Sequence, residues 1–193
     1  MRFVLSTRNA HKVSELADLL PEHELLPLPG DVELPPETAP DFAGNALIKA
    51  RAASAALGVA AIADDSGLEA AALGGAPGVR SARYAGENAT DEDNLAKLIR
   101  EVPAGSALAY VCVIAVVLPD GTEHTVEGRC TGTMADARRG AGGFGYDPVF
   151  VADEDPAGRT MAELTAAEKG AISHRGAAVA AVVPLLESLA ADA

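Results

Sequence analysis

The chain has 193 residues, 49% of them apolar and 4% aromatic, and its formal net charge is −13. This length suits one domain or two tightly joined lobes with a real hydrophobic core. The negative charge argues against a nucleic acid or an anionic membrane as partner, because either would be repelled, although a few focused cations could still bind a phosphorylated small molecule. No uncharged apolar run approaches membrane-spanning length, and Cys112 and Cys130 lack a metal-binding spacing. We therefore expect a soluble, cytoplasmic protein in a reducing compartment.

The N-terminal stretch predicts a strand that leads into a helix. Phe3 to Ser6 reads as the strand, and the apolar residues between Val13 and Leu20 share one helical face. Asn9 suits the N-cap position. The free N–H groups of a helix start favour an anion, and Lys12 adds a positive charge, which indicates a phosphate site. A capped helix with a solvated lysine is the alternative.

The next two segments predict an irregular stretch followed by a helix. Leu25 to Pro40 is rich in proline and acid, which is typical of irregular or edge structure. Phe42 to Leu57 is rich in alanine and predicts a helix that ends at Gly58. Glu37 and Lys49 lie in these segments, and residues of this kind, taken alone, usually belong to a solvated surface.

The stretch from Ala60 to Leu68 is the most informative. Its apolar start predicts a buried strand, which we expect to end abruptly at Asp64 and Asp65. Two anions there are costly unless a cation meets them, and a divalent metal is the simplest partner. Gly67 would then allow a sharp turn. The alternative is an ordinary Asp-Ser-Gly turn with solvated charges.

The middle of the chain predicts mostly local structure. Gly74 to Val79 indicates an ordered loop, and a capping-box pattern at Thr90 begins a helix that runs to about Glu101. The segments Ala107 to Leu118 and Glu123 to Met134 flank a Pro-Asp-Gly turn. They predict an antiparallel hairpin.

The glycine-rich stretch from Gly140 to Pro148 contains two aromatic residues and one acid. Its glycines permit close backbone approach, Phe144 offers a flat apolar face, and Asp147 offers an acceptor. This combination suits a planar heterocycle. A glycine-rich hairpin with one aromatic side chain in the core is the alternative.

Two helices are predicted at the C-terminal end. A capping-box pattern at Thr165 begins a helix that carries Lys169. A second helix starts near His174 and runs toward Leu189, and Pro184 should kink or divide it. Taken alone, a histidine such as His174 is more often structural than catalytic.

Four stretches stand out together: Ser-Thr-Arg-Asn-Ala-His-Lys at 6–12, Ala-Asp-Asp-Ser-Gly-Leu at 63–68, Gly-Gly-Phe-Gly-Tyr-Asp-Pro at 142–148 and Glu-Lys-Gly-Ala-Ile-Ser-His-Arg-Gly at 168–176. Each is weak alone. In this order and spacing they resemble the inosine triphosphate pyrophosphatase family, also called dITP/XTP pyrophosphatases. The resemblance covers essentially the whole chain.

The resemblance implies an α/β protein with a long central mixed β-sheet flanked by helices, in two lobes with the nucleotide cleft between them. It implies one domain over residues 1–193 and a homodimer. The implied reaction is the hydrolysis of ITP, dITP and XTP to the monophosphate and pyrophosphate, with Mg²⁺ as cofactor and Mn²⁺ as its alternative. The partner would be a nucleoside triphosphate, with no nucleic acid and no membrane.

The resemblance also implies a role for each motif residue. The phosphates would be bound by Thr7, Arg8, Asn9, Ala10, His11, Lys12 and Lys49. The metal would be bound by Glu37 and Asp65, with Asp64 close by. Asp65 would also be the catalytic proton acceptor. The base and sugar would contact Ser66, Phe144, Gly145, Tyr146, Asp147, Lys169, His174 and Arg175.

One segment departs from the family pattern, which usually has Glu-Thr-Gly and, further on, an acid before Asn-Ala. Here the chain reads Glu-Thr-Ala at 37–39 and Gly-Asn-Ala at 44–46, so Gly44 replaces the acid. We expect this change to affect the fine geometry of the metal site and the stability of the helix start, whereas Glu37 is retained.

Other interpretations are weighed beside this one. An aspartic-protease half-site at Asp65 would need a second carboxylate that shares a proton, and it gives the lysines no role. A Maf-like pyrophosphatase acting on other modified nucleotides is a closer alternative. A non-catalytic nucleotide-binding module is the alternative from another class, and it would not need Asp64 and Asp65 together.

Overall fold

The computed structural model describes residues 2–191, which contain one mixed six-stranded sheet of order β2-β1-β3-β4-β5-β6. β1 pairs in parallel with β2 and β3, and β5 pairs antiparallel with β6. The strands are β1 Arg2–Leu5, β2 Glu24–Pro27, β3 Ala61–Ala70, β4 Ala107–Val117, β5 Glu123–Met134 and β6 Phe150–Ala152. Together with the flanking helices, this sheet confirms the predicted α/β class.

The α-helices are α1 Ala10–Leu19, α2 Phe42–Leu57, α3 Asp91–Glu101, α4 Ala166–Ile172 and α5 His174–Ala191. Short 3₁₀ helices cover Ala71–Leu73, Gly78–Arg83, Asp147–Val149 and Met161–Glu163. The loop predicted from Gly74 therefore gives way to a helical turn at Gly78, slightly earlier than expected. Within residues 2–191, no helix combines the length and apolar character that crossing a membrane requires.

The described chain forms two compact units. Unit 1 comprises residues 2–65, 112–128 and 178–191, and unit 2 comprises residues 66–111 and 129–177. The chain passes between the units within β3, β4, β5 and α5. The single domain over residues 1–193 and the nucleotide cleft between two lobes stay predictions.

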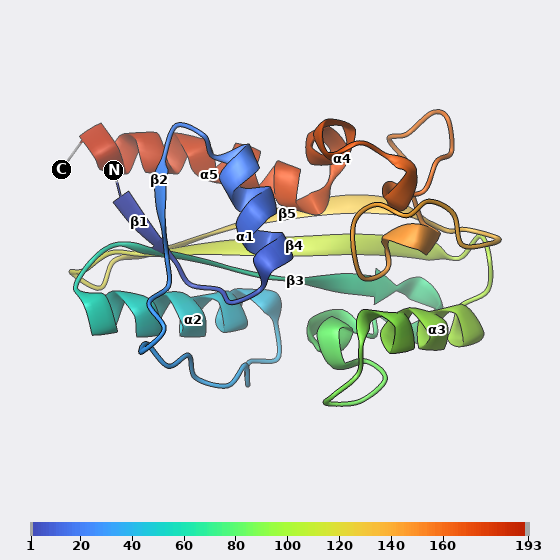
Figure 1. Ribbon diagram of the computed structural model, residues 1–193, viewed down its shortest axis with the longest axis horizontal. Coiled ribbons are helices and arrows are strands. Elements are labelled where there is room, and N and C mark those ends of the chain that lie inside the picture. Colours follow the sequence, from blue (N-terminus) through green and yellow to red (C-terminus); the bar gives the residue numbers. More distant parts are fainter. Residues whose placement is uncertain (1, 192–193) are drawn as a thin grey trace. The chain divides into compact units, whose positions relative to one another are not determined.

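Unit 1 is built around alternating residues of its strands. Phe3 and Leu5 pack into one apolar cluster with residues of α1 and α5, whereas Val4 packs with Ala53 of α2. This alternation follows from the two-residue period of a strand. Figure 1 shows α1 and α5 on one face of these strands and α2 on the other.

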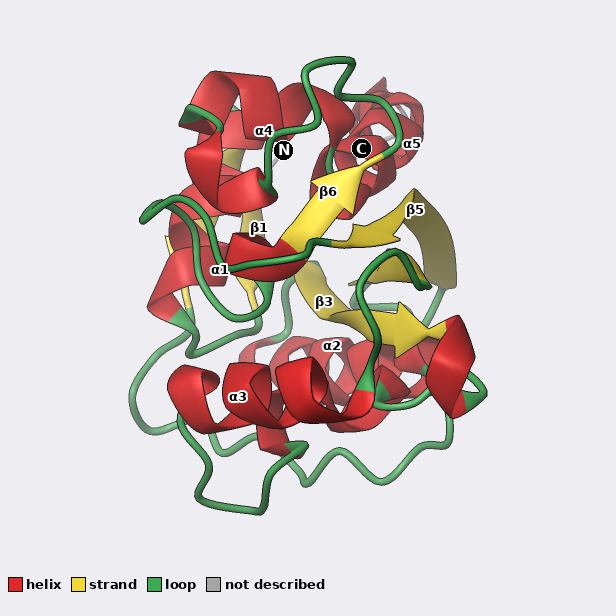
Figure 2. Ribbon diagram, turned by 90° about the vertical axis from the view of Figure 1, so that its right-hand side faces the viewer, coloured by secondary structure: helices red, strands yellow, loops and turns green. Residues whose placement is uncertain are grey.

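Unit 2 has its own core. Leu68 of β3, Tyr110 of β4 and Phe150 of β6 join one cluster with Leu95 and other residues of α3. Figure 2 shows α3 and α4 on opposite sides of the strands of this unit. The loop residues before β6 pack into the same cluster, which holds the glycine-rich stretch in place.

The caps form as predicted. The Asn9 side chain accepts hydrogen bonds from the backbone of His11 and Lys12, and Gly58 ends α2 with a left-handed φ of 65°. Thr90 and Thr165 each form a capping box with the acid three residues later. Local chemistry thus determines these helix ends.

The expected end of β3 at the carboxylates is wrong, and of the two outcomes expected at Pro184, a kink or a division of the helix, the division does not occur. β3 does not end at Asp64 but continues to Ala70, so Gly67 lies within the strand and no turn follows the carboxylates. The carboxylates are met in place by cationic and amide groups, so the backbone can remain extended. Pro184 does not divide α5, which is one helix from His174 to Ala191. A proline costs the helix one N–H donor, and packing of the flanking residues holds the helix together.

Candidate active site

A group of charged side chains in unit 1, here called the carboxylate cluster, comprises Lys12, Glu37, Lys49, Asp64 and Asp65. Lys12 Nζ lies 2.9 Å from Asp64 Oδ2. Lys49 Nζ lies 2.6 Å from Glu37 Oε1 and 3.8 Å from Asp65 Oδ1. The Asp64 and Asp65 side chains are only 0% and 8% exposed, so these contacts act in a poorly solvated environment.

The two adjacent aspartates contact different helices. Asp64 meets Lys12 of α1 and lies 4.0 Å from the Cys112 thiol, whereas Asp65 meets Asn45 and Lys49 of α2. Successive side chains of a strand point to opposite faces, which accounts for this division. The structure therefore groups Asp65 with the acid and lysine of the α2 side and separates it from Asp64.

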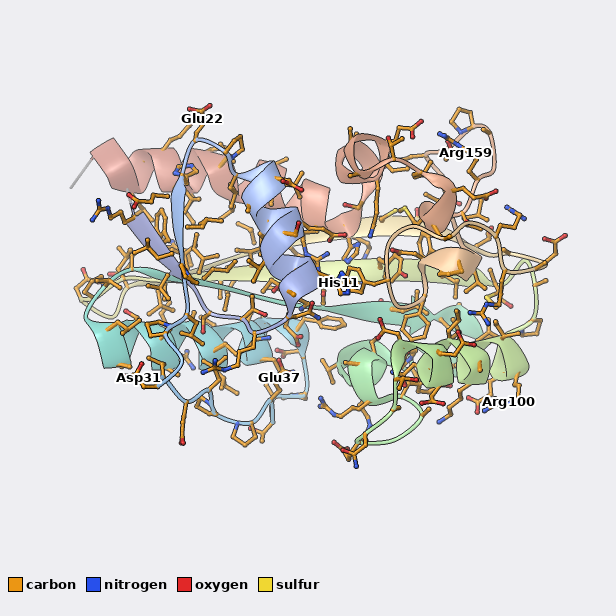
Figure 3. All side chains as sticks on the ribbon, viewed as in Figure 1. His11, Glu22, Asp31, Glu37, Arg100 and Arg159 are labelled. Carbon is orange, nitrogen blue, oxygen red and sulfur yellow. The ribbon has the colours of Figure 1, made fainter. Side chains whose placement is uncertain are left out.

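Glu37 reaches the cluster from the loop that precedes α2, and His11 lies on the first turn of α1 (Figure 3). Glu37 and Asp65 both lie within 4 Å of the Lys49 ammonium group. The Lys49 ammonium group is therefore a positive charge that the Glu37 and Asp65 carboxylates share.

Burial and charge act against each other at these groups. Burial raises the pKa of the Asp65 carboxyl above its ordinary value, and the ammonium groups of Lys49 and Lys12 offset only part of this effect. Burial by itself would lower the pKa of Lys49, but Asp65, Asp64 and Glu37 together raise it. Lys49 therefore stays charged at neutral pH, and Asp65 is shifted toward the range of a general base.

The oxygen ligands of the cluster suit a hard divalent cation. Within residues 2–191 no three His, Cys, Asp or Glu side chains converge as a metal-binding group. Mg²⁺ in nucleotide enzymes is commonly held by one or two carboxylates and completed by water and phosphate oxygens. Glu37 and Asp65, which share the Lys49 cation, fit that requirement, whereas Asp64 faces the α1 side.

The stretch between β1 and α1 is ordered by its own polar groups. Thr7 Oγ1 accepts a hydrogen bond from the backbone N–H of Asn9 at 3.2 Å, and Asn9 caps α1. Ala10 and His11 are exposed in the first turn of α1. Arg8 is exposed as well, and its Nη2 donates to the carbonyls of Val32 and Gly30 at 2.7 and 3.3 Å.

A second group lies in unit 2 and centres on Asp147, which is 3% exposed. Its Oδ2 accepts from Lys169 Nζ at 2.8 Å and from the Phe144 backbone N–H at 3.0 Å. Its Oδ1 accepts from Tyr110 Oη at 3.1 Å. Lys169 Nζ also lies 5.0 Å from the centre of the Phe144 ring. Asp147 thus anchors the glycine-rich loop and fixes the lysine beneath the Phe144 ring.

The loop glycine before Phe144 is required by this anchor. Gly143 has a φ of +69°, and a Cβ at this position would overlap the Asp147 carboxylate. Gly145 has a φ of +60° with open space around it, and its N–H donates to Asp91 at 3.1 Å. Tyr146 is buried, and its hydroxyl donates to the Ser81 carbonyl at 2.7 Å, so it packs into the core.

The start of α5 contributes two buried basic side chains. Arg175 is 1% exposed, and its Nη2 donates to Ser66 Oγ at 3.0 Å. His174 stacks on the ring of Tyr110, with 4.6 Å between ring centres, and Phe150 stacks on the same tyrosine at 4.4 Å. These contacts join Ser66 with Arg175 and join His174 with the Asp147 group through Tyr110.

Two residues of the site were missed by the sequence reasoning. Asn45 donates to Asp65, and Tyr110 holds both Asp147 and His174. Asn45 lies four residues before Lys49, a spacing that places both on one helical face and could have pointed to it. Tyr110 stands in an apolar strand, where a buried hydroxyl calls for a polar partner.

The departure from the family pattern at Gly44 is matched by a second change. A Cβ at Gly44 would come 2.5 Å from the Cβ of Ala39, the residue that stands where the family usually has glycine. The Gly44 N–H donates to Asp41 Oδ1 at 2.7 Å, which caps α2. With alanine at position 39, a side chain at position 44 would therefore overlap its methyl group, and glycine fits there.

The chain belongs to the Ham1 family, whose sequence profile matches residues 3–185. The family resemblance inferred from the motifs is thus confirmed. A curated relative, the dITP/XTP pyrophosphatase of Streptomyces coelicolor, is 44% identical and aligns over 97% of this chain and 98% of its own. A HAM1 protein from Coxiella burnetii has a solved structure with a TM-score of 0.87 and 39% identity, covering 97% of this chain and 99% of that one. The crystal structure of a nucleoside-triphosphatase / dITP/XTP pyrophosphatase from Mycobacterium abscessus gives a TM-score of 0.75 at 43% identity, with coverage of 95% and 100%.

Proposed function

We propose that this chain is a nucleoside triphosphate pyrophosphatase that hydrolyses dITP, ITP and XTP to the monophosphate and pyrophosphate. The observation that carries the proposal is the carboxylate cluster, in which two lysines and three acids meet, in a chain 44% identical to a dITP/XTP pyrophosphatase. Phosphoryl transfer requires carboxylates that hold a metal ion and positively charged side chains that hold the phosphates.

The phosphates would be bound in unit 1. Lys12 and Lys49 are now paired with carboxylates, and each can exchange that carboxylate for a phosphate oxygen. The first turn of α1 adds N–H groups, which favour an anion. Arg8 supports this stretch by holding the backbone near Val32.

A divalent cation, Mg²⁺ or Mn²⁺, held by Glu37 and Asp65 would neutralise phosphate charge and lower the pKa of a bound water. Asp65 would accept a proton from the attacking water, a role that suits a buried carboxylate held by Asn45 and Lys49. The water oxygen bonds to the α-phosphorus, the bond from that phosphorus to the bridging oxygen breaks, and pyrophosphate leaves. Lys12 and Lys49 would stabilise the charge on the leaving group.

The purine base of the nucleotide would be recognised by residues of unit 2. The Phe144 ring offers a flat face, and Lys169 is fixed beside it. Arg175 can only donate hydrogen bonds, so it suits the 6-keto oxygen of hypoxanthine and xanthine and not the 6-amino group of adenine. Ser66 follows Asp65 directly in the sequence, so the residue that orients Arg175 is bonded to the proposed proton acceptor.

The family resemblance also supports a homodimer that acts on the nucleotide pool of the cytoplasm. Cys112 and Cys130 are both buried and are not joined in a disulfide, which is consistent with a reducing compartment. The net charge of −13 argues against nucleic acid or an anionic membrane as partner.

A panel of nucleoside triphosphates tests the proposal. Purified protein is assayed with dITP, ITP, XTP, GTP, ATP and modified pyrimidine triphosphates, with and without Mg²⁺, and pyrophosphate and orthophosphate are measured separately. We expect Mg²⁺-dependent pyrophosphate release from the first three. Turnover restricted to modified pyrimidine nucleotides would favour a Maf-like enzyme. Nucleotide binding with no release under any condition would favour a non-catalytic binding module.

A further inference from the structure

Asn45 lies in the first turn of α2 and is fully buried, with both ends of its amide engaged. Its Oδ1 accepts from the Ala39 backbone N–H at 2.9 Å, and its Nδ2 donates to Asp65 Oδ2 at 3.1 Å. A backbone N–H can only donate, so the amide oxygen must face Ala39. The NH₂ group therefore faces Asp65, and the orientation of the amide is determined.

Asn45 and Lys49 lie one helical turn apart and approach different oxygens of the same carboxylate. Asn45 contacts Asp65 Oδ2, and Lys49 Nζ lies 3.8 Å from Asp65 Oδ1. Two partners on two oxygens prevent the carboxylate from rotating. Lys49 also binds Glu37 and would move to a phosphate during the reaction, whereas the neutral amide of Asn45 has no reason to leave. The Asn45 contact is therefore the one that persists.

The same amide also fixes the loop that carries the other proposed metal ligand. Ala39 is two residues after Glu37, and its N–H is bound to Asn45. We propose that Asn45 is a positioning residue that holds the Asp65 carboxylate and the Glu37 loop in a fixed relation. This inference rests on the proposed function, because it concerns the residues assigned there to the metal and to the proton.

The test compares two substitutions at Asn45 with a matched control. Asn45→Ala removes both hydrogen bonds, whereas Asn45→Asp keeps the size and the acceptor for Ala39 but loses the donor to Asp65. The control is Asn94→Ala in α3 of unit 2. Asn94 is 2% exposed, accepts from Ala85 N at 2.8 Å and donates to the Ala82 carbonyl at 3.0 Å, so it clamps a loop in the same way without touching a proposed site residue.

Four quantities are measured: kcat for dITP, KM for dITP, Mn²⁺ binding to the nucleotide-free protein by electron paramagnetic resonance, and the melting temperature. Loss of a residue that orients a metal ligand typically costs ~10- to 100-fold in metal affinity or activity. We expect both Asn45 variants to lose kcat in that range with little change in KM, and Asn45→Ala to bind Mn²⁺ ~10-fold more weakly. Asn94→Ala should lower the melting temperature by a comparable amount. Its kcat and its Mn²⁺ affinity should stay at the wild-type level.

The outcomes separate positioning from packing. If Asn45→Ala keeps kcat and Mn²⁺ affinity at the level of Asn94→Ala, then Asn45 only packs the helix start and the inference is overturned. Wild-type kcat in Asn45→Asp overturns it equally, and this variant also serves if Asn45→Ala does not fold. If the wild-type protein releases no pyrophosphate from dITP, the proposed function fails, and Mn²⁺ binding still decides whether Asn45 orients the acids.

Discussion

Asp64 and Asp65 are adjacent in the sequence, yet Asp64 binds Lys12 of α1 and Asp65 binds Asn45 of α2. A strand that continues through both residues directs them to opposite faces. The two carboxylates therefore make different hydrogen bonds and ion pairs on the two faces of the strand, and they should respond differently to substitution.

The first prediction compares these two aspartates. Asp65→Asn removes the charge assigned to the metal and to the proton, so we expect kcat for dITP to fall by at least ~10²-fold, the usual cost of losing a general base. Asp64→Asn removes the partner of Lys12 and should cost clearly less. Steady-state kinetics at saturating Mg²⁺ decide this. Near-normal turnover in Asp65→Asn, or an equal loss in both variants, would contradict the assignment.

The second prediction concerns the coupled changes at Ala39 and Gly44. Replacing a glycine inside a helix by alanine usually raises the free energy of unfolding by ~0.5–1 kcal/mol. In Gly44→Ala the new Cβ would overlap Ala39 Cβ, so this variant should instead lower the free energy of unfolding by ~1–3 kcal/mol through overpacking. Adding Ala39→Gly should recover most of that loss. Urea unfolding of both single variants and the double variant gives the coupling free energy, and simple additivity would show that the two positions are independent.

The third prediction concerns the Tyr110 hydroxyl. Tyr110→Phe keeps the ring that stacks on His174 but removes the donor to Asp147, so the Phe144 loop should loosen and KM for dITP should rise. Tyr146→Phe is the comparison for stability alone, because its hydroxyl donates to the Ser81 carbonyl within the core, whereas the family resemblance assigns Tyr146 to the substrate. Both should lose ~0.5–1.5 kcal/mol of stability. An unchanged KM in Tyr110→Phe would separate Asp147 from substrate binding.

The fourth prediction concerns base selectivity. Arg175→Ala should lower kcat/KM for ITP and for XTP by a similar factor. It should also reduce the ratio of these values to kcat/KM for ATP, a ratio that mismatched hydrogen-bond donors can raise to ~10⁴. Arg175→Lys keeps the charge but not the planar fork, so it should recover only part of the selectivity. If Arg175→Ala keeps the wild-type ratio of ITP to ATP, another donor reads the base.

Much of this architecture could be predicted because local signals decide it. The capping residues Asn9, Thr90 and Thr165 and the left-handed Gly58 mark helix ends through their own hydrogen bonds and backbone preferences. The ordered motifs were specific enough to identify the family. In these places local preference and the final structure agree.

The errors and omissions arise where distant residues decide the outcome. The end of β3 was predicted at the carboxylates because the apolar run stops there, but the strand continues, and the groups that meet the carboxylates come from α1 and α2 and cannot be seen within the strand itself. The contact of Arg8 with backbone carbonyls some twenty residues further along the chain could not be foreseen either, and its assignment to the phosphates stays a prediction. Asn45 and Tyr110 likewise act only through contacts made by folding.

The central claim, attack of water on the α-phosphorus, is tested most directly by hydrolysing dITP in ¹⁸O-labelled water and analysing both products by mass spectrometry. The account predicts that one ¹⁸O atom enters dIMP and that pyrophosphate carries none, because the bond from the α-phosphorus to the bridging oxygen is the one that breaks. Label found in pyrophosphate or orthophosphate, with unlabelled dIMP, would place the attack on another phosphorus and contradict the account.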